Sequence, residues 1–264
     1  MGARLDQHYL VDARVRDAIA QAADVRDGDS VLEIGPGRGM LTAALLPRAR
    51  TVVAVELDEL LAAHLSDALG RPDNLRVVNA DCLEFDLESL GPGPWKVAAN
   101  LPYAVATPIL QRILRWPHWS AAVLMFQKEV AERITARPGG ADFGLLTLSV
   151  AIHASAELLL EVSRESFRPR PQVASAVVYL QRRPQPLVPA SEQKGFFRVA
   201  KAAFGQRRKM ALGVLARGLG LERGRVAEAF DALGLPLSAR AEQIALPQWQ
   251  ELARLIGGSA DQQA

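Results

Sequence analysis

Short apolar runs alternate with amphipathic segments through the amino-terminal two thirds of the chain. Five mainly apolar runs predict the strands of a sheet, at residues 30–34, 51–55, 75–78, 95–99 and 121–126, and the first of these strands is predicted to be buried on both faces. The segments between them carry apolar residues at every third or fourth position, which is the spacing of a helix face. Asp12 is a candidate N-cap for the first of these helices. The alternation predicts an α/β fold built on a doubly wound, Rossmann-like parallel sheet.

The pattern changes after these strands. Apolar residues at 158–162 and 174–180 predict a closing pair of strands, and residues 184–189 (PQPLVP) predict a linker. Beyond the linker helical spacing dominates, and four helices are predicted, at residues 192–204, 206–218, 223–233 and 246–256. The sequence therefore predicts two domains, an α/β domain at residues 1–183 and a small all-α domain at residues 184–264.

Residues that can do chemistry follow four successive predicted strands, at the point where each strand ends. They are the glycine-rich turn 35–39 (GPGRG), Glu56, Asp81 and residues 100–103 (NLPY). Because the carboxyl ends of parallel strands lie at one edge of a sheet, we expect these groups to converge on one cleft. Each motif alone is a weak signal, since an acid can simply cap a helix and NLPY can form an ordinary turn.

The spacing of the glycines indicates which nucleoside the cleft binds. A dinucleotide fingerprint requires a third glycine where Met40 stands, and a Walker loop requires Gly-Lys-Ser/Thr, so both are excluded. A Glu-x-Gly-x-Gly-x-Gly turn suits S-adenosylmethionine, which carries no phosphate and needs close backbone approach, here at Gly35 and Gly37. Glu56, 21 residues after Gly35, is then expected to accept hydrogen bonds from the ribose hydroxyls. Asp81 is expected to bind the adenine amino group.

Residues 100–103 are the candidate catalytic motif. The Asn100 side-chain oxygen can accept a hydrogen bond, Pro102 restricts the backbone, and Tyr103 offers a stacking face. Together these residues can hold a planar ring that bears an amine.

Composition narrows the class of protein. The chain has 264 residues, of which 49% are apolar and 23% charged, as in soluble globular proteins. Its single cysteine, Cys82, excludes an intrachain disulfide and fits a reducing cytosol. No run resembles a signal peptide, and no window has the roughly 18 uncharged apolar residues of a membrane span. We therefore expect a cytoplasmic protein without a membrane partner and without a metal cofactor.

Basic residues are concentrated in one part of the chain. The net charge is only +2, yet residues 164–217 contain 12 Lys and Arg against two acids. One interpretation is a solvated, arginine-rich face. The other is a surface for polyphosphate, most simply nucleic acid. On the second interpretation the candidate RNA-binding residues are Arg168, Arg170, Arg207, Arg208 and Lys209.

The combination of motifs resembles the small-subunit ribosomal RNA adenine dimethyltransferase family over nearly the whole chain. The segments that carry the resemblance are residues 7–10 (QHYL), 33–39 (EIGPGRG), 55–58 (VELD), 100–103 (NLPY), 127–133 (QKEVAER), 167–173 (FRPRPQV), 204–209 (FGQRRK) and 240–242 (RAE). The chain departs from the family pattern at Asp6, where Gly is frequent, and at Tyr9, where Phe is usual. It also has AVA at residues 104–106, where Asn-Ile-Ser is common.

The resemblance implies a cofactor, a substrate and a partner. The cofactor is S-adenosylmethionine, with contacts at His8, Leu10, Gly35, Glu56, Asp81 and Asn100. The reaction is N6,N6-dimethylation of two adjacent adenosines near the 3′ end of 16S rRNA, within an immature 30S subunit. Domain 1–183 would bind the cofactor and catalyse transfer, and domain 184–264 would contribute to RNA binding. We expect the chain to act as a monomer.

The adenine substrate that the resemblance implies gives residues 100–103 a catalytic role. We predict that Asn100 and the main-chain carbonyl of Leu101 or Pro102 accept the two N6 protons of the adenine, so that its lone pair faces the sulfonium methyl group. Tyr103, together with Phe167, is predicted to stack on the base. No strong general base is evident, and none is needed, because the amine loses its proton after attack.

Other functions are consistent with parts of this pattern. An erythromycin-resistance-type methyltransferase shares the fold and chemistry but modifies 23S rRNA, and here QKEVAER and GQRRK favour the small-subunit enzyme. A DNA adenine methyltransferase would more usually have Pro at position 101. A ribosome-assembly factor without activity would not need Glu56, Asp81 and Asn100, which are all present. A nicotinamide dehydrogenase is disfavoured by Met40.

Overall fold

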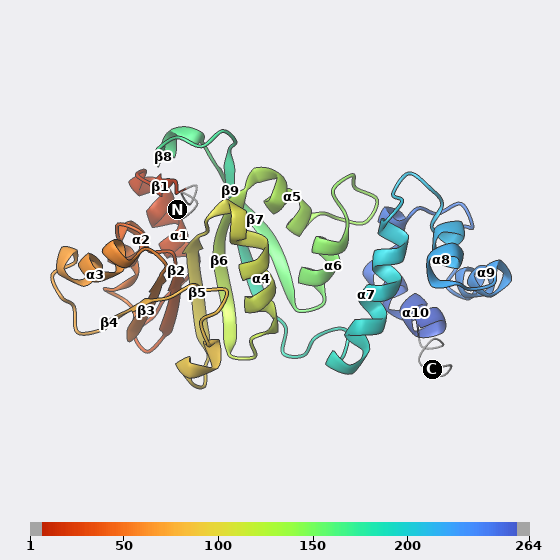
Figure 1. Ribbon diagram of the computed structural model, residues 1–264, viewed down its shortest axis with the longest axis horizontal. Coiled ribbons are helices and arrows are strands. Elements are labelled where there is room, and N and C mark those ends of the chain that lie inside the picture. The colour runs from red at the N-terminus through yellow and green to blue at the C-terminus, as the bar shows by residue number, and fades with distance from the viewer. Residues whose placement is uncertain (1–6, 258–264) are drawn as a thin grey trace. The chain divides into compact units, whose positions relative to one another are not determined.

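The computed structural model describes residues 7–257, and the chain folds into two compact units (Figure 1). The first unit contains the chain up to Ala131 together with Ala154–Arg182, and the second contains Glu132–His153 and the chain from Arg183 onward. The predicted first domain, residues 1–183, includes residues 132–153. They belong to the second unit because Phe143, Leu148 and Ile152 are buried in the same apolar cluster as the helices that follow the linker.

A seven-stranded sheet forms the centre of the first unit. Its strand order is β4-β3-β2-β5-β6-β9-β7. The first five strands in this order are parallel, and β9 runs antiparallel to both of its neighbours, β6 and β7. The strands are β2 (Ser30–Ile34), β3 (Thr51–Glu56), β4 (Leu75–Asn79), β5 (Trp95–Asn100), β6 (Trp119–Gln127), β7 (Ala154–Val162) and β9 (Ser175–Arg182). The predicted α/β, Rossmann-like fold is confirmed. The closing pair differs from chain order in that β9 lies between β6 and β7.

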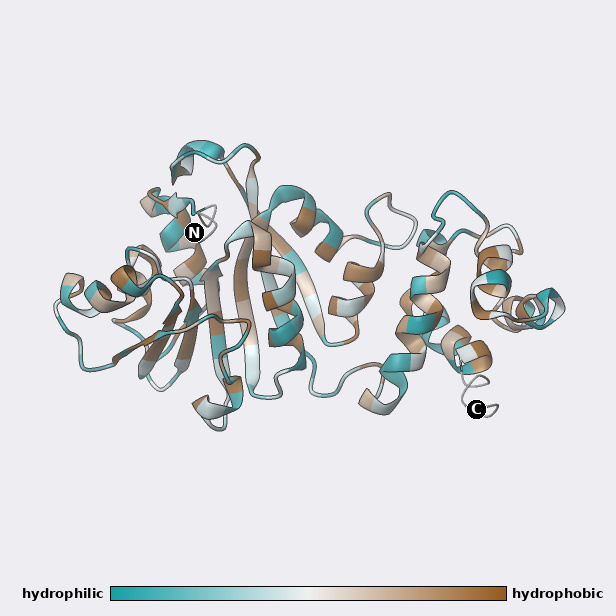
Figure 2. Cartoon of the chain, in the orientation of Figure 1, coloured by the Kyte–Doolittle hydropathy of each residue, from teal (hydrophilic) through white to brown (hydrophobic). Residues whose placement is uncertain are grey.

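Amphipathic helices cover the sheet of the first unit. Val31 and Val52 of the sheet share an apolar cluster with Ile19 of α1 and Leu45 of α2. Asp12 caps α1 as predicted, accepting the N–H of Arg14. In Figure 2 the strands of the sheet are mainly brown to white, whereas the helices carry both apolar (brown) and polar (teal) residues. The helices are α1 (Ala13–Ala22), α2 (Met40–Leu45), α3 (Glu59–Ala68), α4 (Ala106–Arg115) and the first half of α5 (Lys128–Thr135), which continues into the second unit, with short 3-10 helices η1 (Leu87–Leu90), η2 (Tyr103–Val105) and η3 (Arg164–Ser166).

A second, two-stranded sheet was not predicted from the sequence. Strand β1 (Tyr9–Leu10) pairs antiparallel with β8 (Phe167–Arg168), so that Tyr9 lies opposite Arg168 and Leu10 opposite Phe167. Strands of two residues carry no periodic signal. The pairing brings the QHYL segment beside the FRPRPQV segment, although the two are far apart in the chain.

The second unit is built from helices around its own core. Phe196, Phe230 and Trp249 are fully buried there. The predicted helix at residues 206–218 is wrong over its first turn, because residues 205–209 form a turn and α8 begins at Ala211. The helices are α6 (Leu145–Ala151), α7 (Ala190–Phe204), α8 (Ala211–Leu219), α9 (Arg223–Ala232), α10 (Leu246–Gly257) and the 3-10 helix η4 (Ala241–Gln243). Over residues 7–257, none of the helices is both long and apolar enough to cross a membrane.

Candidate active site

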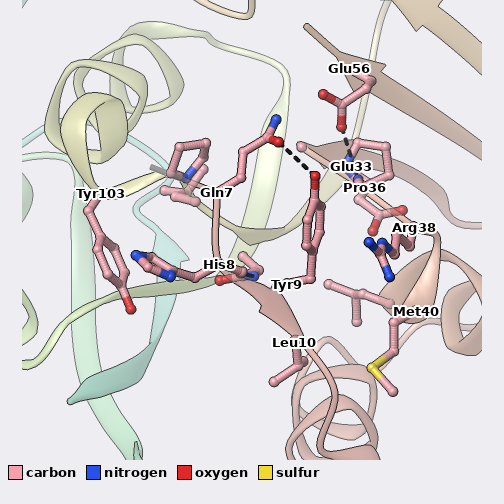
Figure 3. Close-up of a pocket in the computed structure, with 16 residues that line it drawn as sticks. Gln7, His8, Tyr9, Leu10, Glu33, Pro36, Arg38, Met40, Glu56 and Tyr103 are labelled. Carbon is pink, nitrogen blue, oxygen red and sulfur yellow. Dashed lines mark hydrogen bonds between the residues drawn. The ribbon is translucent and has the colours of Figure 1, made fainter. Parts of the chain in front are cut away.

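A pocket lies at the carboxyl ends of β2, β3 and β5 (Figure 3). Its volume is small, about 80 Å³. It brings together nine of the predicted site residues, namely His8, Leu10, Gly35, Gly37, Glu56, Asn100, Leu101, Pro102 and Tyr103. Seven further residues line the pocket and were not among the predicted site residues, namely Gln7, Tyr9, Glu33, Pro36, Arg38, Met40 and Leu41. These lie in or beside the same motifs, so extending each motif to its neighbours would have found them.

The glycine turn and Glu56 are joined by hydrogen bonds. Gly35 and Gly37 have φ angles of +67° and +57°, a left-handed conformation that residues with a Cβ rarely adopt. Glu56 Oε2 accepts the N–H of Gly37 at 2.9 Å, and Oε1 accepts the N–H of Asp58 at 2.9 Å. These two hydrogen bonds hold the Glu56 carboxylate in one orientation. Each of its oxygens has a further lone pair, so Glu56 can still accept hydrogen bonds from a ligand.

Glu33 is a buried acid that the sequence analysis did not assign to the site. It lies near the end of β2 and is 1% exposed, and its Oε2 has no hydrogen-bond partner among residues 7–257. Burial raises the pKa of Glu33 to about 8, and repulsion by Glu56 adds to the shift. An unsatisfied buried oxygen is unfavourable, so it is available to a hydrogen-bond donor or a cation in the pocket. An acid within an otherwise apolar strand is the signal that identifies it.

The side chain of Asn100 is fixed by the first described residues of the chain. Its Nδ2 donates a hydrogen bond to the main-chain oxygen of His8 at 3.1 Å. A carbonyl oxygen only accepts, so this contact determines which end of the amide is the nitrogen. Asn100 Oδ1 has no partner within the described residues and remains available as an acceptor. The His8 ring in turn contacts Tyr103, with 5.6 Å between the ring centroids, and its Nδ1 lies 2.8 Å from the carbonyl oxygen of Pro169.

Two predicted site residues do not line the pocket. Asp81 follows β4, beside the strand that ends at Glu56, and its Oδ1 accepts the N–H of Leu83 at 2.8 Å. Phe167 is fully buried, in the same apolar cluster as Leu10. Its ring therefore offers no face to a base, and the predicted stacking by Phe167 would require β1 and β8 to shift. Tyr103 is the predicted stacking residue that the pocket does contain.

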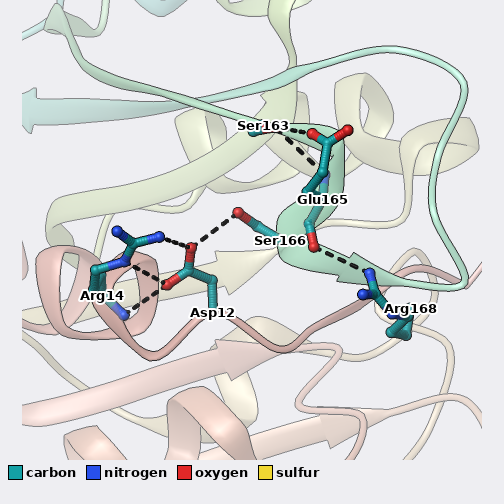
Figure 4. Close-up of polar contacts among 6 residues, drawn as sticks. All are labelled: Asp12, Arg14, Ser163, Glu165, Ser166 and Arg168. Carbon is teal, nitrogen blue, oxygen red and sulfur yellow. Dashed lines mark hydrogen bonds and ion pairs between the residues drawn. The ribbon is translucent and has the colours of Figure 1, made fainter.

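The predicted basic residues fall into two groups. Arg168 and Arg170 are exposed on and after β8, which pairs with the pocket strand β1. Figure 4 shows the contacts of the segment at residues 163–168, which leads into β8. Ser166 Oγ donates a hydrogen bond to Asp12, which also binds Arg14, and Arg168 donates to the carbonyl oxygen of Glu165. The segment is thus anchored to the start of α1.

The second basic group lies in the turn before α8. Arg207 donates hydrogen bonds to the carbonyl oxygens of Ala141 and Phe143, within the second unit. Arg208 and Lys209 are exposed, and their side chains have no partner within residues 7–257. Arg207 therefore holds two loops together, and the cations available to a ligand are those of Arg208 and Lys209. No group of three or more His, Cys, Asp or Glu residues in the described chain is arranged to hold a metal ion.

The chain is similar to known proteins over nearly its whole length. The ribosomal RNA adenine dimethylase family matches residues 2–255. The chain is 41% identical over 261 residues to ribosomal RNA small subunit methyltransferase A of Moorella thermoacetica, covering 95% of this chain and 90% of that protein. The protein of the same name from Desulfitobacterium hafniense is also 41% identical, covering 97% and 92%.

Two solved structures of RNA-modifying enzymes have a similar fold over nearly the whole chain. The crystal structure of the 23S rRNA methyltransferase ErmE superposes with a TM-score of 0.76 at 30% identity, over 94% of this chain and 99% of that chain. A dimethyladenosine transferase from Plasmodium falciparum superposes with a TM-score of 0.77 at 25% identity, over 93% and 96%. The chain belongs to the ribosomal RNA adenine dimethylase family.

Proposed function

We propose that this chain transfers methyl groups from S-adenosylmethionine to N6 of two adjacent adenosines near the 3′ end of 16S rRNA, within an immature 30S subunit. As a member of its family it is an rRNA adenine dimethyltransferase. The observation that carries the proposal is the orientation of Asn100, whose amide nitrogen is engaged by His8 while Oδ1 stays free in the pocket.

The pocket residues fit S-adenosylmethionine. Glu56 has acceptor capacity left for the ribose hydroxyls, and Glu33 Oε2 is an orphaned buried acceptor for the methionine ammonium group. Gly35 and Gly37 have no Cβ, which allows the cofactor to approach the backbone closely. His8 and Leu10 complete the wall, and Asp81 would bind the adenine if the η1 loop moves toward the pocket. When bound, the cofactor supplies an activated methyl group.

The chain positions the target adenine for in-line attack. Asn100 Oδ1 accepts one N6 proton and the carbonyl of Leu101 or Pro102 the other; the Pro102 carbonyl also accepts the N–H of Val105, at 3.1 Å, and has a second lone pair. Both bonds favour a tetrahedral nitrogen whose lone pair faces the methyl group. Orientation of this kind can lower the activation barrier by roughly 7–11 kcal/mol. Tyr103 stacks on the base, which must be unpaired or turned out of its helix, at a cost of a few kcal/mol.

The RNA partner accounts for the basic residues outside the pocket. Arg168 and Arg170 border the pocket strand in the first unit, and Arg208 and Lys209 are exposed cations of the second unit. Contacts of these side chains with phosphates would make binding strongly dependent on salt. We propose that the reaction takes place in the cytoplasm and that the chain acts as a monomer.

The test is methyl transfer from radiolabelled S-adenosylmethionine to precursors of the 30S subunit, followed by mass mapping of the modified nucleotides. We expect N6,N6-dimethyladenosine at two adjacent positions near the 3′ end of 16S rRNA. The ErmE likeness makes 23S rRNA the second candidate substrate, so free 23S rRNA is assayed in parallel. Modification of 23S rRNA alone would refute the proposal, and no transfer to either RNA would favour a non-catalytic assembly factor.

A further inference from the structure

The ring of Tyr9 occupies the space beside the glycine turn. A Cβ built on Gly37 would lie 3.1 Å from Cδ1 and 3.2 Å from Cε1 of Tyr9, so the ring packs directly against this part of the backbone. The guanidinium of Arg38 lies over the ring, 4.8 Å from its centroid. The Tyr9 hydroxyl donates a hydrogen bond to Gln7 Oε1 at 2.6 Å (Figure 3). Three separate contacts therefore hold the ring in the pocket.

A pocket with Tyr9 in this position is too small for a nucleoside cofactor. Its volume is about 80 Å³, whereas pockets for ligands of this kind measure about 300–1,000 Å³. The opposite wall is rigid, because the glycine turn and Glu56 are joined by a hydrogen bond between neighbouring strands of the large sheet. Room for the cofactor must therefore come from the wall that contains Tyr9.

The Tyr9 side chain is the part of this wall that can move. Strand β1 itself is held by its pairing with β8, by the core position of Leu10 and by the hydrogen bond from Asn100 to the His8 carbonyl. Tyr9 is half-buried, so its ring has a path to solvent. Few contacts need to break for the ring to leave Gly37, and all of them are local.

We propose that Tyr9 is the gate of the cofactor pocket. Its ring must leave Gly37 before S-adenosylmethionine can bind, and the hydrogen bond to Gln7 holds it in place. This inference rests on the proposed function, because it takes the pocket to be the cofactor site. Contacts that must be broken on binding reduce the apparent affinity, so weakening the gate strengthens cofactor binding.

The test compares two tyrosines that make the same hydrogen bond. Tyr9→Phe removes only the hydroxyl that binds Gln7. Tyr179→Phe is the matched control, since the Tyr179 hydroxyl donates to Gln181 Oε1, also at 2.6 Å, and Tyr179 does not line the pocket. We expect Tyr9→Phe to lower the Kd for S-adenosylhomocysteine about two- to tenfold, the effect of one hydrogen bond, as measured by calorimetry on the full chain. Tyr179→Phe should leave the Kd unchanged.

A second variant tests the same bond from its other end. Gln7→Ala should lower the Kd by a similar factor, and the double variant Gln7→Ala, Tyr9→Phe should bind no more tightly than either single variant. An unchanged or higher Kd for Tyr9→Phe, in a wild-type chain that binds the ligand, would overturn the gate and leave the proposed function standing. Absence of saturable binding by the wild type would overturn both.

Discussion

The hydroxyl of Tyr103 lies 2.6 Å from Oγ of Ser175, although the two residues are 72 positions apart in the chain. Ser175 begins β9 and is fully buried, so it is a fixed anchor. The ring of Tyr103 is therefore oriented by a strand outside its own motif. A stacking surface that is ordered in advance loses little conformational freedom when a base binds to it.

Two substitutions of Tyr103 separate its ring from its hydroxyl. Tyr103→Ala removes the stacking surface, worth about 1–3 kcal/mol per base, and should raise the KM for the RNA substrate by about one to two orders of magnitude. Tyr103→Phe keeps the ring and should retain most activity. Because this variant lacks the hydrogen bond to Ser175, its free energy of unfolding should fall by about 1 kcal/mol. Steady-state assays on 30S precursors and urea unfolding measure both effects. Equal loss of activity in the two variants would contradict the stacking role.

Asn100→Ala should abolish transfer without releasing the RNA. Removal of one positioned hydrogen-bond group at a reacting centre costs about 10²–10³-fold in kcat, and the phosphate contacts made elsewhere are unaffected. Single-turnover kinetics and filter binding report the two quantities separately. Asn100→Asp is the informative comparison, because it places an acceptor against the His8 carbonyl, which is also an acceptor. If RNA affinity falls as far as kcat, Asn100 does not have the role assigned to it.

Glu33 predicts a pH dependence of stability. Its pKa is about 8 in the folded chain against an ordinary value of 4.5, so between these values the folded state binds one more proton than the unfolded state. This stabilising contribution is fully present below about pH 4.5, and is lost at up to about 1.4 kcal/mol per pH unit as the pH rises to about 8. Glu33→Gln cannot ionise and should lack this loss. Urea unfolding at several pH values measures the difference between the two chains, which should grow from pH 5 to pH 8 in favour of Glu33→Gln. A constant difference would show that Glu33 is ionised throughout.

Some parts of this site follow from the sequence because they depend only on the parallel sheet. Glu56 and Asn100 end β3 and β5, the two parallel strands on either side of β2, and a parallel sheet places such residues at one edge whatever the details of packing. The position of Tyr9 could not be predicted in this way. It depends on the pairing of β1 with β8, which joins segments about 160 residues apart and leaves no periodic signal. The same is true of Phe167, whose motif is intact while its ring is buried in the core.

Cys82 should be inert in the folded chain. Burial raises the pKa of its thiol to about 11, and only the thiolate reacts with alkylating agents. Iodoacetamide at pH 8 is therefore expected to label the unfolded chain much faster than the folded chain, as followed by mass spectrometry. Rapid labelling under native conditions would contradict the burial of Cys82, which is 7% exposed.

Three neighbouring cations before α8 should have different effects when removed. Arg207 is hydrogen-bonded to the carbonyl oxygens of Ala141 and Phe143, so Arg207→Ala should destabilise the chain by about 1–2 kcal/mol. Arg208 and Lys209 make no such contact, and Arg208→Ala and Lys209→Ala should leave unfolding unchanged. Instead, each should weaken RNA binding and reduce the slope of log K against log salt by about one.

The comparison is sharp because all three variants remove one positive charge from adjacent positions. Any long-range effect of net charge on RNA affinity is therefore common to them, and Arg207→Ala serves as the control for it. Thermal unfolding and salt titrations of RNA binding give the two readouts. If Arg207→Ala lowers the salt slope as much as Arg208→Ala while leaving stability intact, then Arg207 contacts phosphate and its carbonyl contacts must give way to the RNA. If none of the three changes the slope, the turn before α8 is a solvated basic surface and the phosphate contacts lie elsewhere, with Arg168 and Arg170 the next residues to substitute.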